Sequence, residues 1–116
     1  MKVQKSEIAE EVNDIVCCAL TTLNSGAAFG FVVITGTPEL TNLHELQLFL
    51  GWNPAHEFAS ELERQLRAGR TVLAICVLVH VGRGNIYRDI HIAQPYAADS
   101  GLRCSVARIV AAHLGH

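Results

Sequence analysis

The sequence has few charged and few aromatic residues: 17% of its 116 positions are Asp, Glu, Lys or Arg, and 6% are Phe, Trp or Tyr. Because 50% of the residues are hydrophobic and folded domains ordinarily carry about 25% charged residues, the composition excludes an intrinsically disordered chain. The length suffices for one hydrophobic core and is too short for two domains of ordinary size. We therefore expect a single globular domain over residues 1–116.

No apolar run in the sequence is long enough to cross a bilayer. The two longest, residues 26–34 and 72–79, fall well short of the roughly 18 residues that a transmembrane helix needs. The first residues also lack the apolar segment of a secretory signal, because acidic residues begin at Glu7. We expect a cytoplasmic protein that does not associate with membranes.

Several signatures of metal and phosphate sites are missing. The four cysteines form no Cys-x-x-Cys pair, and their spacing is unlike a disulfide framework, so reduced thiols are expected. The dipeptides at 44–45 and 56–57 begin like the zinc-binding motif His-Glu-x-x-His, but Leu48 and Ser60 occupy the position of its second histidine. The sequence has no Gly-Lys-Ser/Thr phosphate loop. We expect neither a bound metal nor a cofactor.

Apolar periodicity and turn residues predict seven elements in the order α-β-α-α-β-β-α. Pro38 and Pro54 each follow a residue that can cap a helix, which is a signal for a helix start. Two consecutive helices are therefore expected between the first two strands. The predicted helices span residues 6–23, 38–50, 54–68 and 99–114, and the predicted strands span residues 29–34, 71–81 and 86–93.

This order predicts an α+β fold with a small three-stranded mixed sheet packed by helices. A right-handed crossover through two helices would make the first two strands parallel. A turn at residues 82–85 would join the last two strands as an antiparallel hairpin. The first or the third strand would then lie at an edge, where a second copy of the chain could add to the sheet.

Charge is divided between the two halves of the chain. Residues 1–63 carry a net charge of −7 and residues 64–116 a net charge of +5. Every base in the second half is an arginine, whose planar fork suits carboxylates and phosphates. One hypothesis is therefore an anion-binding surface made by Arg64, Arg67, Arg70, Arg83 and Arg88. The alternatives are complementarity within the chain and docking to a protein partner or a second copy.

The strongest candidate for chemistry lies on the predicted hairpin. A two-residue loop at 83–84 sets a register in which His80 lies opposite Tyr87 and Cys76 lies opposite His91. Either histidine would be a general base, oriented by a carboxylate, and the phenol would donate to developing negative charge. A slip of one residue would instead pair His80 with Ile86 and dissolve the group. The candidate catalytic residues are His80, Tyr87, Asp89 and His91.

No motif in the sequence identifies a family. The low fraction of charged residues and the mean hydropathy of +0.27 indicate more apolar side chains than one small core can bury, so some apolar surface is expected to remain exposed. We therefore expect a small binding or regulatory protein that acts through protein–protein contacts as a homo-oligomer, most simply a homodimer. The alternatives are a small enzyme or ligand-binding protein that uses the hairpin face, and binding of phosphate or nucleic acid by the arginines. Nucleic acid is the less favoured ligand, because the net charge is −2.

Overall fold

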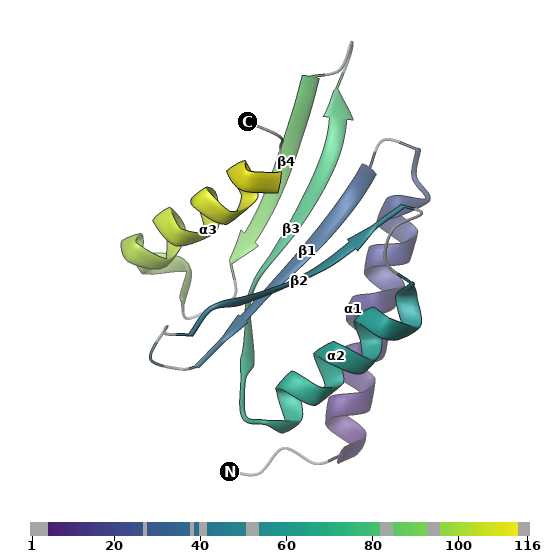
Figure 1. The fold of residues 1–116 in the computed structure, drawn as a ribbon, viewed down its shortest axis with the longest axis vertical. Helices are drawn as coiled ribbons and strands as arrows, with labels where there is room; N and C mark the ends of the chain where they lie inside the picture. The colour runs from purple at the N-terminus through teal and green to yellow at the C-terminus, as the bar shows by residue number, and fades with distance from the viewer. Residues whose placement is uncertain are drawn as a thin grey trace.

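The computed structural model describes residues 5–26, 28–37, 39, 42–50, 54–81, 85–92 and 96–113. Within these ranges the chain forms an α+β fold of three α-helices and one four-stranded antiparallel sheet (Figure 1). The predicted α+β class is thus confirmed. No helix within the described ranges is long and apolar enough to span a membrane. The elements are α1 (Lys5–Leu23), β1 (Ala28–Gly36), β2 (His44–Phe49), α2 (Ala55–Arg67), β3 (Thr71–Val81), β4 (Asn85–Ile92), the 3-10 helix η1 (Tyr96–Ala98) and α3 (Ser100–His113).

The sheet has the strand order β2-β1-β3-β4, and every neighbouring pair is antiparallel. The predicted three-stranded mixed sheet is therefore wrong. The two central strands, β1 and β3, were expected to be parallel, but β2 reverses the direction of the chain between them. β4, the third predicted strand, lies at one edge, and β2 forms the other edge.

Residues 44–49 form β2, where a helix was predicted from the spacing of the leucines. Leu46 and Leu48 alternate with the more exposed Glu45 and Gln47, and both leucines are buried in the core. This period of two lets one face of the segment pack inward while its backbone pairs with β1. Pairing with an existing strand outweighs the weaker helical pattern, so the predicted helix over residues 38–50 is wrong for residues 44–49.

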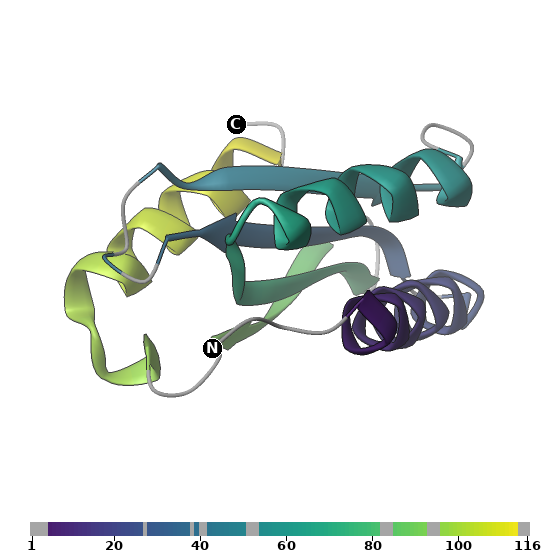
Figure 2. The same ribbon diagram turned by 90° about the horizontal axis from the view of Figure 1, so that it is seen from below.

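Helices cover both faces of the sheet, with α1 and α2 on one side and α3 on the other (Figure 2). Alternation along β1 supplies both layers of the core. Phe31 and Val33 belong to the α1/α2 side, and Val32 and Ile34 belong to the α3 side, all four fully buried. The ring of Phe31 meets Phe58 of α2 edge to face, with ring centroids 6.4 Å apart.

A buried polar cluster fixes the junction between α2 and β3. The helix ends in a turn in which Gly69 has φ +90 and the amide of Arg70 donates to the carbonyl oxygen of Gln65 at 3.2 Å. The Arg70 guanidinium then donates to the carbonyl oxygen of Thr35 at 3.2 Å and to that of Asn42. The Thr35 hydroxyl donates to the Gln65 side chain, and both side chains are buried. Arg70 therefore ties the end of β1 to the segment that precedes β2.

A row of three rings lies at one end of the sheet. The Phe29 ring stacks against His80, with centroids 4.4 Å apart, and lies 6.4 Å from the ring of Phe49. Gly30 is the β1 partner of Phe49, and a Cβ added to it would overlap the Phe49 ring. The glycine therefore gives the Phe49 side chain room to lie across the backbone of β1.

Candidate functional site

The register of the β3–β4 hairpin differs by one residue from the prediction. His80 pairs with Ile86, and His91 pairs with Ile75. The difference arises because three residues, not two, separate the ends of β3 and β4. Directly opposite residues share a face, and successive residues alternate, so His80 and His91 lie on opposite faces of the sheet. The predicted grouping of His80 with the other three candidate residues on one face is therefore wrong.

Two of the four candidate catalytic residues remain together. Asp89 pairs with Val77, so Asp89 and His91 share the face that α1 and α2 cover farther along the sheet, and both are exposed. The backbone of Tyr87 belongs to β4, but its side chain lies outside the described residues. Cys76, predicted to lie opposite His91, is instead fully buried in the core on the α3 side.

His80 has a structural role at the end of the sheet. Its imidazole stacks on Phe29 with an angle of 26° between the ring planes. Offset stacking of this kind favours a fixed orientation of both rings. Among the described residues, its aromatic neighbour thus accounts for the position of the imidazole.

Two of the five arginines predicted to bind anions form ion pairs within α2. Arg64 pairs with Glu61 and Arg67 pairs with Glu63. The hydrogen bond from Arg64 is the main reason that the pKa of the Glu61 carboxyl lies below its ordinary value. Exposed pairs of this kind add little stability, but they place a carboxylate beside each guanidinium. This part of α2 therefore presents no surplus of positive charge.

The other three predicted anion-binding arginines form no described cluster. Arg70 donates to two backbone carbonyl groups and has a structural role. Arg83 lies outside the described residues, and only the backbone of Arg88 is described, paired with Leu78. The anion-binding surface stays a prediction.

The described residues contain no group of three or more His, Cys, Asp or Glu side chains placed to hold a metal ion. None of the four cysteines forms a disulfide, and three of them are exposed. Cys76 lies on β3 beside β4, but it is buried on the α3 side, whereas Asp89 and His91 are exposed on the other face. The described part of the chain therefore offers no metal centre.

The sequence alone did not indicate the surface along β4. Ile90 is half-buried toward α3, and the exposed residues Asp89 and His91 flank it on the opposite face. A pocket of about 410 Å³ opens here. Ile90, Ile92 and Val106 all belong to the core layer on the α3 side, so the pocket lies between β4 and α3 on that face of the sheet. The lining residues are Ile90, His91, Ile92, Ala97, Arg103 and Val106.

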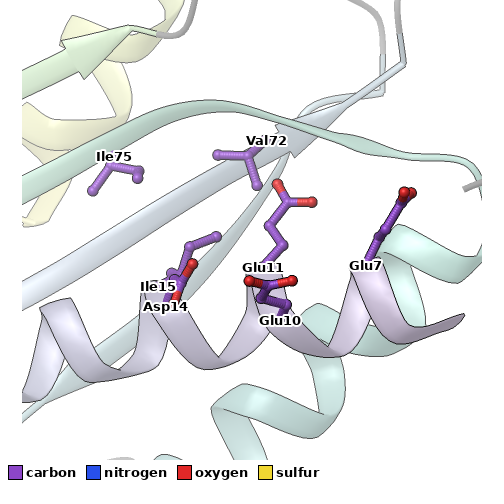
Figure 3. Close-up of a pocket in the computed structure, with 7 residues that line it drawn as sticks. All are labelled: Glu7, Glu10, Glu11, Asp14, Ile15, Val72 and Ile75. Carbon is purple, nitrogen blue, oxygen red and sulfur yellow. The ribbon is translucent and has the colours of Figure 1, made fainter. Parts of the chain in front are cut away.

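A second pocket, of about 450 Å³, lies between α1 and β3 (Figure 3). Val72 and Ile75 point from β3 toward the helix, and Glu11 reaches toward Val72 (Figure 3). Ile75 is also the β3 partner of His91, so this acidic pocket lies on the same face of the sheet as Asp89 and His91. Part of the negative charge of the first half of the chain is concentrated here, on Glu7, Glu10, Glu11 and Asp14.

The chain was compared with protein-family models, with curated proteins and with solved structures, and no significant match was found. No residue therefore takes a role from a relative. The geometry of β4 and of the surfaces beside it is the basis for a functional assignment.

Proposed function

We propose that this chain is a small protein-interaction domain that assembles with a second copy of itself through the β4 edge of its sheet. The observation that carries the proposal is the position of β4 at the end of the strand order, with a pocket beside it on the α3 side of the sheet. An edge strand presents a row of backbone donors and acceptors to which another strand can pair. Two-fold self-association is the commonest form of oligomer.

Apolar side chains next to β4 support the same surface. Ile75, Val77 and Val79 of β3 pack against the core on the α1/α2 side, yet each is only partly buried. The apolar excess of the sequence is thus partly located beside the open edge, where a partner would cover it. β2, the other edge, is six residues long against eight for β4, and offers fewer backbone groups for pairing.

Sedimentation equilibrium tests this function on the unmodified chain. From micromolar to near-millimolar concentration we expect a mass that rises from that of the 12.6 kDa monomer to that of a dimer. Backbone pairing and apolar contact provide the free energy of association, so the dimer is expected to persist in high salt. A mass that stays at 12.6 kDa throughout would contradict the proposal.

The other functions considered have less support. An enzyme that uses all four hairpin residues is not proposed, because His80 and His91 lie on opposite faces. Binding of phosphate or nucleic acid has no described arginine cluster behind it. Association through the β4 edge is therefore the function that the geometry supports best.

A further inference from the structure

We infer that the β4 strands of two copies pair antiparallel about a two-fold axis at Ile90, so that Asp89 of each copy lies opposite His91 of the other. This inference rests on the proposed function and specifies the register of that association. It identifies β4 as a self-complementary strand whose partner is a second copy of this chain.

Symmetry restricts the registers that are possible. When two identical strands pair antiparallel about an axis perpendicular to the sheet, the residue on the axis faces its own counterpart, and the residues on either side of it are exchanged. An axis at Ile90 therefore pairs Asp89 with His91 of the second copy, twice. An axis one residue earlier would place the two Asp89 carboxylates opposite each other, and one residue later the two His91 rings.

Hydrogen-bond complementarity between Asp89 and His91 favours the axis at Ile90. Asp89 and His91 are both exposed and share a face of the sheet, because their β3 partners are Val77 and Ile75. Directly opposite side chains in an antiparallel pair have Cβ atoms about 4.5–5.5 Å apart, and two carboxylates at this distance repel each other. An imidazole N–H can instead donate a hydrogen bond to a carboxylate oxygen. Only the register centred on Ile90 pairs the carboxylate with the imidazole.

The other face of the strand provides the apolar contact. Ile90 points toward the α3 side, where its β3 partner is the buried Cys76, and it remains partly exposed. At the axis the Ile90 side chains of the two copies would meet. The 410 Å³ pocket beside them is lined by Ile92 and Val106 as well as Ile90, and it has room for an isoleucine of the second copy. One face of the pairing is thus polar and the other apolar.

Two single substitutions that change the charge at positions 89 and 91, tested separately and in a mixture, test this register. The variant His91→Asp places two carboxylates opposite each other at both ends of the pairing, and we expect its homodimer dissociation constant to rise about tenfold. Asp89→Lys removes both attractive pairs and is also expected to weaken the homodimer. In a mixture of the two variants, the unchanged Asp89 faces the unchanged His91, and the introduced aspartate faces the introduced lysine. The mixed dimer should therefore bind about as tightly as the unmodified chain.

Sedimentation equilibrium measures the homodimers, and native mass spectrometry measures the fraction of mixed dimer. The matched control is His56→Asp, which makes the same change at an exposed histidine of α2 and should leave the dissociation constant unchanged within about twofold. A dimer that is indifferent to His91→Asp, or a mixture without preference for the mixed dimer, would overturn the register while leaving the proposed function intact. An unmodified chain that stays monomeric would overturn both.

Discussion

Replacing Phe31 with alanine is expected to lower the free energy of unfolding by roughly 3–5 kcal/mol. Phe31 is fully buried on the central strand β1, and its ring packs edge to face on Phe58 of α2. Removing the ring leaves a cavity between the sheet and α2, and Phe58 loses its aromatic contact. Urea denaturation, extrapolated linearly to water, measures the change.

Leu50→Ala is the matched control for this substitution. Leu50 is 57% exposed and follows the edge strand β2, so its truncation should change the free energy of unfolding by no more than about 0.5 kcal/mol. If Phe31→Ala lowered the free energy of unfolding as little as Leu50→Ala, that result would contradict the burial of the Phe31 ring between the sheet and α2.

Replacing Arg70 with methionine is expected to cost roughly 2–3 kcal/mol, because two backbone carbonyl groups lose a charged donor. These are the carbonyl oxygens of Thr35 and Asn42, in segments that the guanidinium holds together. Methionine keeps most of the apolar length of the arginine side chain, so the loss reports mainly on the hydrogen bonds. Thermal or urea unfolding monitored by circular dichroism provides the measurement.

Arg64→Met provides the comparison for Arg70. The Arg64 side chain is 75% exposed and pairs with a neighbouring carboxylate on its own helix, so its removal should have little effect on the free energy of unfolding. Equal losses for the two arginines would show that Arg70 is an ordinary surface residue. The anion-binding hypothesis, which treats both arginines alike, would then regain support.

Most of the fold follows from local signals in the sequence. The predicted helices at residues 6–23 and 54–68 and the predicted strand at 71–81 correspond to α1, α2 and β3 within a few residues. The start of the last helix was also predictable, because Asp99 accepts a hydrogen bond from the amide of Leu102 at 2.7 Å, as a capping residue does. Periodicity and capping act over a few residues and can be recognised without tertiary information.

Strand β2 could not be predicted from the same signals. Leu43, Leu46 and Leu50 fit a helical spacing, whereas Leu46 and Leu48 fit the alternation of a strand. In a segment this short both patterns are present, and the outcome is decided by the backbone of β1, to which the segment pairs as an antiparallel strand. The pairing with β1 cannot be recognised from the residues of the segment itself. The helix prediction therefore agreed with the local pattern, but it was wrong.

The predicted grouping of the candidate catalytic residues depended on whether the β3–β4 loop has two or three residues. The glycines at 82 and 84 are compatible with a tight hairpin of either two or three residues. Because side chains alternate with a period of two, a slip of one residue moves every side chain of β4 to the other face relative to its neighbours on β3. The sequence identified Asp89 and His91 as notable residues, but it could not assign His80 to the other side of the sheet.

The antiparallel pairing of β1 with β3 has a consequence for how the chain folds. The β1–β2 and β3–β4 pairs are hairpins of residues close in sequence, whereas the β1–β3 pair brings Phe31 next to Val77 and encloses both β2 and α2. Closing that long segment costs chain entropy before any contact of the central pair is gained. We therefore expect the two hairpins to form early and separately, and their meeting along β1 and β3 to set the folding rate.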